Sequence, residues 1–226
     1  MKRYFNNEII VVGLIVLVSL VVQGCDRRQA AIEKVKKLGG TVEMDKEKPE
    51  SSVMTVSLMD CRVNDAELGF LKYISGLEKL DLRNTKINGE GLIHLKGVTS
   101  LKKLLLHYCP ITDAGIKQIK ELSSLTELDV GHSFISDKGM GYIGKMKGLR
   151  ELCLSDVEIT DEGLKNLNQL QGLVRLYIND TYITDAGLEH LKDLTQLVQV
   201  DISNTKCTEA GLAGLEEVLS RNRANR

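Results

Sequence analysis

The sequence predicts an α/β solenoid, with a parallel sheet on its concave face and short helices outside it. Two observations predict this fold. From residue 53 the chain repeats every 24 residues, seven times, without an insertion or a deletion. Within each repeat, positions 1, 4, 6, 11, 16, 19 and 22 are apolar in all seven copies. A unit this short cannot bury its own apolar face, so successive units must stack into one continuous core.

The first part of each repeat is predicted to form a strand with one buried face. Positions 4 and 6 are apolar, as Leu104 and Leu106 are in the third repeat, and the positions beside them are mostly polar. Side chains alternate between the two faces of a strand. Positions 3, 5 and 7 are therefore expected on the concave face, and position 8 at its rim.

The second half of each repeat is predicted to form a short helix. Position 12 holds Asn, Thr or Ser, which cap helices, and position 13 is acidic in six repeats, where it meets the positive end of the helix dipole. Apolar residues at positions 16, 19 and 22 mark the buried stripe. Glycine fills position 15 in six repeats. Because a helical glycine costs about 1 kcal/mol relative to alanine, we interpret it as room for a close approach to the next repeat.

Position 9 forms a column of small hydroxyl and thiol groups. The fifth repeat departs from this column, because Val157 stands there. Its side chain can neither donate nor accept a hydrogen bond. We therefore expect the hydrogen-bonded column to be interrupted at this repeat.

Composition and charge narrow the class of protein. The 226 residues are 42% hydrophobic and 27% charged, and the formal net charge is −1. These values exclude a disordered chain, a strongly basic nucleic-acid binder and a membrane protein with many spans. The length is sufficient for one domain with a substantial core.

The repeats resemble a known family. Residues 173–196 read LVRLYINDTYITDAGLEHLKDLTQ, and their ITDAGL segment is typical of the cysteine-containing leucine-rich repeats of F-box-associated and bacterial proteins. The resemblance covers residues 53–220 and implies a leucine-rich-repeat horseshoe, with seven parallel strands inside and seven short helices outside. No F-box segment precedes the repeats in this sequence, which argues against the ubiquitin-ligase adaptor role of many relatives.

The N-terminus is predicted to carry an export signal. The basic sequence MKR is followed closely by fourteen uncharged residues, 9–22, which as a helix would span about 21 Å of the roughly 30 Å hydrocarbon core. A basic start and a short apolar stretch are typical of a secretory signal. Residues 22–25 (VQGC) resemble a bacterial lipobox, which implies that Cys25 becomes the lipid-bearing N-terminus. The predicted location is thus the bacterial cell envelope, facing the periplasm or the exterior. An uncleaved signal anchor, with Cys25 an incidental thiol, is the alternative.

The segments around the repeats are expected to serve as signal, caps and tail. Ile32, Val35 and Leu38 share one face of a predicted capping helix over residues 30–38, and residues 41–44 are expected to add a short strand over the first repeat. The predicted divisions are a lipoprotein-type signal peptide (1–24), the lipid-anchor Cys25 with capping helix and linker (25–52), the leucine-rich-repeat domain (53–220) and a frayed basic tail (221–226).

No motif in the sequence supports an enzyme. A glycine-rich phosphate loop after a strand, a G-x-S-x-G segment and a C-x-x-C pair are all absent. We therefore predict a non-catalytic protein without a cofactor or metal. The strongest chemical alternative is a three-ligand metal site formed by His107, His132 and Cys153 on neighbouring strands. These residues occupy positions 7, 8 and 5 of their repeats, so their side chains need not converge.

The concave face is the predicted binding surface. Leu105 and Tyr177 occupy position 5, where most other repeats place polar residues, and such anchors among polar neighbours are typical of protein interfaces. The predicted partner-binding residues are Leu105, His107, Tyr108, His132, Cys153 and Tyr177. The predicted function is a membrane-tethered module that binds a protein or peptide and no nucleic acid. The alternative is a structural lipoprotein that assembles with itself and organises the envelope.

Overall fold

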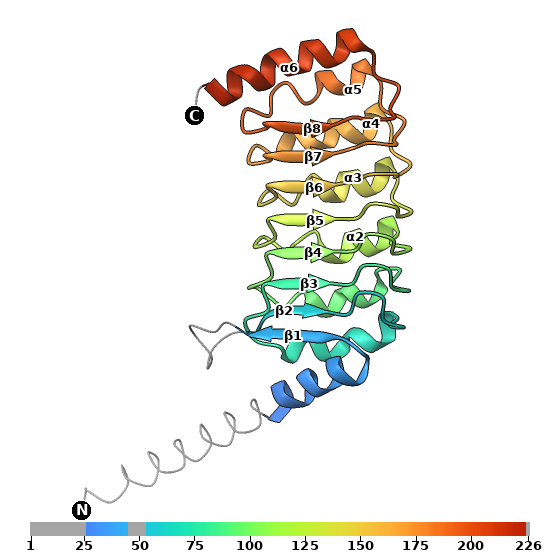
Figure 1. Cartoon of the computed structure of the whole chain (residues 1–226), viewed down its shortest axis with the longest axis vertical. Helices are drawn as coiled ribbons and strands as arrows, with labels where there is room; N and C mark the ends of the chain where they lie inside the picture. Colours follow the sequence, from blue (N-terminus) through green and yellow to red (C-terminus); the bar gives the residue numbers. More distant parts are fainter. Residues whose placement is uncertain (1–25, 45–52, 225–226) are drawn as a thin grey trace, which may run out of the picture.

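The computed structural model describes residues 26–44 and 53–224 (Figure 1). The predicted signal over residues 1–24, the lipid-anchor Cys25 and the predicted polar linker lie outside the described residues. Within the described part, none of the helices has the length and apolar character needed to cross a membrane.

The described strands form one eight-stranded sheet whose spatial order follows the sequence. β1 (Thr41–Met44) runs antiparallel to β2 (Val53–Ser57), and each later pair of neighbours is parallel. The other strands are β3 (Lys79–Asp81), β4 (Lys103–Leu105), β5 (Glu127–Asp129), β6 (Glu151–Cys153), β7 (Arg175–Tyr177) and β8 (Gln199–Asp201). Paired residues in parallel neighbours are 24 positions apart, as Leu104 and Leu128 are. Each position of the repeat therefore forms a column across the sheet.

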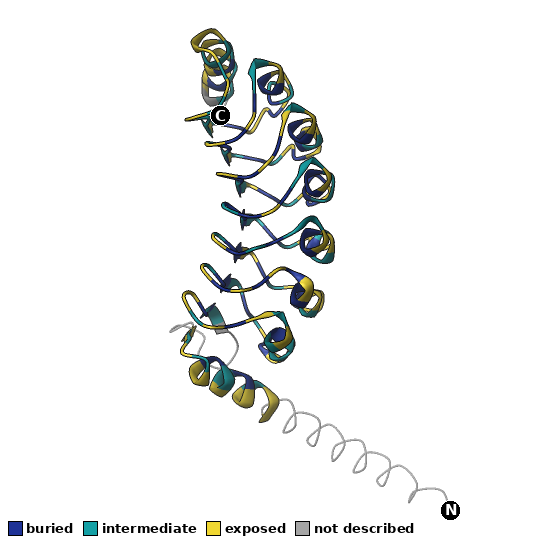
Figure 2. Cartoon of the chain, turned by 90° about the vertical axis from the view of Figure 1, so that its right-hand side faces the viewer, coloured by how far each residue is buried: buried dark blue, intermediate teal, exposed yellow. Residues whose placement is uncertain are grey.

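Short helices lie on the outer side of the sheet (Figure 2). The first two repeats use 3-10 helices and the later repeats mainly α-helices, since segments of so few residues form either type readily. In order they are η1 (Asp65–Tyr73), η2 (Glu90–Leu95), α2 (Asp113–Ile119), α3 (Asp137–Ile143), α4 (Asp161–Leu164), η3 (Lys165–Gln169), α5 (Asp185–Glu189) and α6 (Glu209–Ala224). The predicted leucine-rich-repeat solenoid is confirmed.

The apolar columns meet between the sheet and the helices in one continuous core. Leu104, Leu128 and Leu152 at position 4 are fully buried. Burying each such side chain contributes about 1.5–3 kcal/mol before the entropy of folding is counted. This core is built without a disulfide among the described cysteines, all four of which are free.

A second set of contacts joins each repeat to its neighbour. Asp137 at position 13 accepts a hydrogen bond from the Thr160 backbone N–H at Oδ1 (2.8 Å) and another from the Thr160 hydroxyl at Oδ2 (2.7 Å). The same two bonds join Asp113 to Ser136, Asp161 to Thr184 and Asp185 to Thr208. The acidic residue predicted to meet its own helix dipole thus also fixes the start of the next helix.

Glycine at position 15 leaves space for this aspartate. A Cβ atom placed on Gly163 would lie 2.2 Å from Asp137 Oδ1, far inside van der Waals contact. Gly139, Gly187 and Gly211 face the aspartate of the preceding repeat in the same way. The close approach predicted for this glycine is present, but it is made to the preceding repeat and not to the next one.

The N-terminal end of the solenoid is capped. Residues 26–37 are helical and bury Ala31 and Val35 in the core, with Ile32 and Leu38 partly buried beside them. Gly39 then adopts a φ of +88°, a conformation that commonly ends a helix. β1 follows and pairs with β2, so the structure contains both parts of the predicted cap.

The C-terminal end differs from the prediction. Helix α6 continues through Ala224, so residues 221–224 do not fray as expected. Arg221 pairs with Glu217 one turn earlier at 2.6 Å, which favours the helical state there. Val200 and Ile202 of the last repeat are only partly buried, because no further repeat of the described chain stacks on them.

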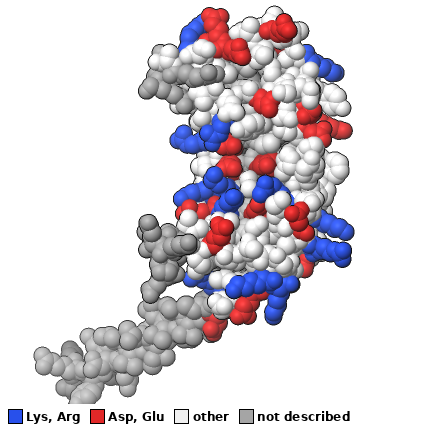
Figure 3. All heavy atoms as spheres, viewed as in Figure 1, with Lys and Arg blue, Asp and Glu red and all other residues white. Residues whose placement is uncertain are grey.

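Basic and acidic side chains are interspersed over the face seen in Figure 3. On the concave sheet, Lys103 pairs with Glu127 at 2.5 Å, and Arg175 pairs with Glu151. The charges thus neutralise one another between adjacent strands. A surface of this kind does not favour binding of nucleic acid, because the phosphate backbone is attracted by a continuous positive field.

Candidate functional site

Position 8, three residues after the end of each parallel strand, has a left-handed backbone in all seven repeats, with φ between +53° and +60°. Five repeats place Asp or Asn there: Asp60, Asn84, Asp156, Asp180 and Asn204. Asn, Asp and His are the non-glycine residues enriched in this conformation, whereas Tyr rarely adopts it. The other two repeats place Tyr108 and His132 there, at φ +58° and +53°. Backbone strain of this kind is concentrated at functional sites.

The two exceptional side chains stack on each other. The ring centroids of Tyr108 and His132 are 4.1 Å apart, with an angle of 18° between the planes. His107 packs edge-on against both, at centroid distances of 4.6 Å and 4.9 Å. We call His107, Tyr108 and His132 the aromatic patch. Tyr108 is 57% exposed, so the patch presents a ring to solvent at the rim of the concave sheet.

Carboxylates hold the two histidine rings in place. His107 Nδ1 lies 3.0 Å from Asp129 Oδ1, and His132 Nδ1 lies 2.6 Å from Asp156 Oδ2. A partner on one ring nitrogen fixes the orientation of an imidazole and leaves the other nitrogen for a ligand. The patch is therefore oriented before any partner arrives.

A shallow hollow lies on the N-terminal side of the patch. It has a volume of about 440 Å³ and is lined by Met59, Asp60, Arg83, Asn84, His107 and Tyr108. Arg83 is held within this wall by Asp81, to which its guanidinium donates at 2.9 Å and 2.7 Å. The hollow thus combines an exposed methionine with polar groups that are already oriented.

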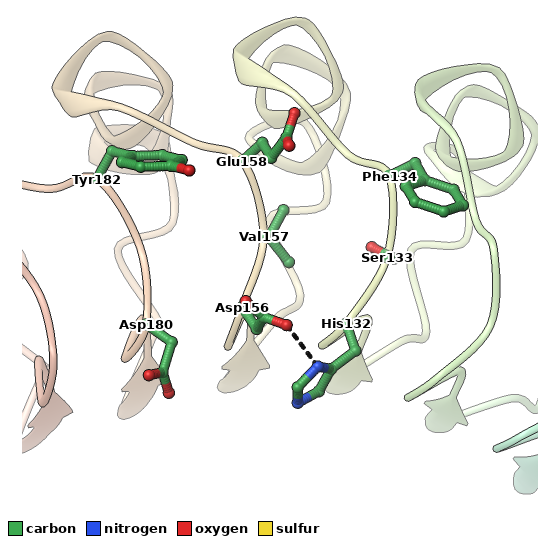
Figure 4. A pocket seen from close by; sticks show the side chains of 8 residues that line it. All are labelled: His132, Ser133, Phe134, Asp156, Val157, Glu158, Asp180 and Tyr182. Carbon is green, nitrogen blue, oxygen red and sulfur yellow. Dashed lines mark ion pairs between the residues drawn. The ribbon is translucent and has the colours of Figure 1, made fainter.

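A second hollow of about 350 Å³ lies on the C-terminal side. In Figure 4, Phe134, Glu158 and Tyr182 form one row, and His132, Asp156 and Asp180 form another beneath it. Phe134 and Tyr182 are 71% and 54% exposed. No lysine or arginine occurs among the described residues that line this hollow, which are His132, Ser133, Phe134, Asp156, Val157, Glu158, Asp180 and Tyr182.

Two further features make the second hollow polar. Hydrogen bonds from the side chains of Asn179 and Asn204 lower the pKa of Asp180, so its carboxylate stays ionised well below neutral pH. The buried Ser133 hydroxyl has no hydrogen-bond partner among the described residues. Its neighbour in the position-9 column is Val157, which agrees with the predicted interruption of that column.

Cys153 lies deeper in the concave sheet than the patch. Its Sγ is 3.3 Å from Ser155 Oγ, and Asp129 stands beside it in the register of β5 and β6. Burial, reinforced by the negative charge of Asp129, raises the pKa of this thiol to about 11. The thiol is therefore protonated at neutral pH and a poor nucleophile.

The structure brings most of the predicted binding residues together but corrects one of them. His107, Tyr108 and His132 form the patch, and Tyr177 is half-buried next to Cys153 in the sheet. Leu105 is only 8% exposed, so its predicted role as a solvent-exposed anchor is wrong. Its column, position 5, lies between positions 3 and 7 of the concave face.

Sequence reasoning missed three residues of this region. Phe134 and Tyr182 stand at position 10, a loop position that was assigned no role, although they are the only aromatic residues in that column. Asp129 was treated as one polar residue among several at position 5. The composition of position 10 was the missed signal for the two rings, because three of the other five repeats place a lysine or an arginine there.

Comparisons with known proteins agree with this fold. A family model described as Leucine Rich repeat matches residues 77–96 and 121–144, and no curated protein gives a significant match. The solved structure of internalin C2 from Listeria monocytogenes is 22% identical, with a TM-score of 0.55 over 72% of this chain and 77% of that one. Internalin F from the same organism is 22% identical, with a TM-score of 0.57 over 77% of this chain. The match spans only 56% of the internalin F chain, and at this identity the likeness shows the fold.

Proposed function

We propose that this chain, a leucine-rich-repeat protein, is a membrane-tethered and non-catalytic module that binds a protein or peptide. Its binding surface is the aromatic patch together with the two hollows beside it. The observation that carries the proposal is the left-handed backbone of Tyr108 and His132. Asn or Asp adopts that backbone at lower cost than Tyr, as in the other repeats, so folding alone does not account for the Tyr108 ring, on which the His132 ring stacks.

The second hollow favours a basic side chain of the partner. Phe134 and Tyr182 present exposed rings at opposite ends of the row in Figure 4, and Glu158 and Asp180 add carboxylates. Lys206 Nζ already lies 5.3 Å from the centroid of the Tyr182 ring. A lysine or arginine of the partner would therefore gain charge attraction and a cation–π contact with Phe134, the latter worth about 0.5–2 kcal/mol. The exposed ring of Tyr108 would supply the apolar contact that dominates many protein interfaces.

The test compares what the full chain captures from envelope membranes with what the Tyr108→Asn/His132→Asn variant captures. Asn already occupies this position in two other repeats, so the fold is expected to persist. Tyr73→Asn, which removes an exposed tyrosine from η1 on the outer side, is the matched control. A partner retained by the wild type and the control but lost by the double variant supports the proposal. Equal capture by all three chains contradicts it.

The membrane tether is proposed to be a lipid on Cys25. The support is the resemblance of residues 22–25 to a lipobox, which implies export and modification of this thiol. Metabolic labelling with a radioactive fatty acid is expected to label the wild type and not the Cys25→Ser variant. An unlabelled wild type would favour the uncleaved signal anchor.

Self-assembly is the second candidate function, and the end of the solenoid favours it. β8 has a neighbour on one side only in the described sheet, and Val200 within it and Ile202 directly after it are only partly buried. An unpaired strand edge with apolar neighbours can accept another chain. Sedimentation of the full chain in mild detergent separates the two functions, because a monomer at high concentration excludes assembly through this edge.

A further inference from the structure

We propose that His107, Asp129 and Cys153 form a binding site for a divalent cation of the zinc type on the concave sheet. Each offers one ligand atom, and these three atoms lie within 4.8 Å of one another. They come from three successive repeats, so the stacking of the solenoid itself brings them together. The set differs from the one the sequence indicated, since Asp129 takes the place of His132.

The three donors suit zinc. Imidazole nitrogen, carboxylate oxygen and thiolate sulfur are the ligands it takes in proteins, at bond lengths of about 2.0–2.3 Å. A tetrahedron with such bonds separates its ligand atoms by roughly 3.4–3.6 Å. His107 Nδ1 and Asp129 Oδ1 are 3.0 Å apart as a hydrogen-bonded pair, so an ion would replace their shared proton and separate the two atoms by roughly 0.5 Å. A bound ion would also deprotonate the Cys153 thiol.

His132 is not a member of this group of ligand atoms. Its Nδ1 is paired with Asp156 Oδ2 at 2.6 Å, in the repeat after its own. The carboxylate paired with His107, by contrast, is Asp129, which lies beside Cys153 in the register of β5 and β6. Three residues that look equivalent in the sequence therefore divide into two ligands and one member of the rim.

Gly131 makes the site possible. It stands at position 7, the column of His107, one repeat later. A Cβ atom on Gly131 would lie 2.4 Å from His107 Nδ1, so any side chain would displace the imidazole from Asp129. The Gly131 backbone N–H also donates to Asp129 Oδ1 at 3.1 Å, which orients the carboxylate. Support of this kind is what positions metal ligands in known sites.

The site leaves an open position for a fourth ligand. A hollow of about 220 Å³ lies over Asp129 and Cys153 and is also lined by Ser155, Tyr177 and two glutamates. Zinc sites with three protein ligands complete their coordination with water or with a group from another molecule. The bound ion would thus face the hollow of the concave sheet.

The test measures metal binding by the full chain, purified in mild detergent without a histidine tag. Zn²⁺ affinity is measured by competition with a chromophoric chelator, and Co²⁺ is added separately to record its absorption spectrum. We expect one ion per chain and a thiolate–cobalt charge-transfer band in the near ultraviolet. His107→Asn and Cys153→Ser are expected to weaken Zn²⁺ binding at least about 100-fold, and Gly131→Ala about 10- to 100-fold.

Two control variants make the assignment specific. Cys61→Ser removes another half-buried thiol, and His132→Asn removes the histidine that the sequence alone would have chosen. Both are expected to bind Zn²⁺ and Co²⁺ as the wild type does. A wild type without a thiolate–cobalt band overturns the proposal, as does loss of binding in His132→Asn with binding retained in Gly131→Ala. Far-ultraviolet circular dichroism of each variant checks that the solenoid is intact.

Discussion

At Tyr108 and His132, two energies of similar size oppose each other. The left-handed backbone costs about 1–2 kcal/mol for a residue with a large side chain, and Asn reduces that cost because its short polar side chain tolerates this conformation. The stacked rings return about 0.5–1.5 kcal/mol. The His132–Asp156 pair and the edge-on contacts with His107 add to this return, so the patch contributes little net stability to the fold.

This balance predicts that removing both rings changes the free energy of unfolding very little. The Tyr108→Asn/His132→Asn variant is expected to have about the same free energy of unfolding as the wild type, because relief of the left-handed backbone is offset by loss of the stack, of the edge-on contacts with His107 and of the His132–Asp156 pair. Urea denaturation followed by circular dichroism measures the difference. A variant that is destabilised by more than about 1 kcal/mol would show that the rings serve the fold.

At the scale of the element, the aspartate of the preceding repeat fixes the start of α3, α4, α5 and α6. The start of α4, for example, is held by Asp137 through both the backbone N–H and the hydroxyl of Thr160. This arrangement explains why glycine recurs two residues after the aspartate position, since the aspartate of the preceding repeat fills the space of a side chain. Helix propensity and packing between repeats thus oppose each other at this glycine.

A comparison of two glycines in α3 tests that explanation, because only one of them faces the aspartate of the preceding repeat. Gly139→Ala places a Cβ atom 2.3 Å from Asp113 Oδ1, whereas at Gly141 the nearest atom lies 3.8 Å away. Gly139→Ala is expected to destabilise the protein by about 1–3 kcal/mol through overpacking. Gly141→Ala is expected to stabilise it by up to about 1 kcal/mol through helix propensity. Thermal unfolding of the two variants measures both effects, and equal changes would contradict the explanation.

The same contacts predict a pH dependence. Hydrogen bonds from the Thr208 hydroxyl and backbone N–H lower the pKa of Asp185. A carboxylate with a lowered pKa contributes stability above its unfolded-state pKa and loses it as the pH falls through its folded-state pKa. Thr208→Val removes the hydroxyl donor and is expected to raise the pKa of Asp185 toward its ordinary value. A carbon-13 NMR titration of that carboxyl between pH 2 and pH 6 measures the shift, and an unchanged pKa would contradict this assignment of its cause.

At the scale of the whole molecule, periodicity was enough to predict the architecture. One apolar residue at each buried position of each repeat specifies the stack, because the same contacts recur at every step. The pattern could not predict the last turns of α6, since its Arg221–Glu217 pair has no equivalent in the other repeats. The pattern also could not predict that Leu105 is only 8% exposed. A column shows which face of the sheet a side chain lies on, but not how much of that side chain is covered.

The candidate site was predictable only in part, for the same physical reason. A repeat shows which column a residue occupies but not where its side chain turns, so His107 and Tyr108 were selected while Asp129 was passed over. Gly131 carries no side chain, and its effect on His107 becomes visible only when the two repeats are stacked. The structure was therefore needed to assign roles to the residues that differ from the others at the same position of the repeat.

The central claim is that the aromatic patch exists for binding and not for stability. The measurement that tests it most directly is calorimetric titration of the captured partner into the wild type and into Tyr108→Asn/His132→Asn, with the urea midpoint of both chains determined alongside. We predict at least about 30-fold weaker binding, corresponding to the roughly 2 kcal/mol of an interface hot spot, with a midpoint that is not lowered. Equal affinity for both chains would contradict the claim.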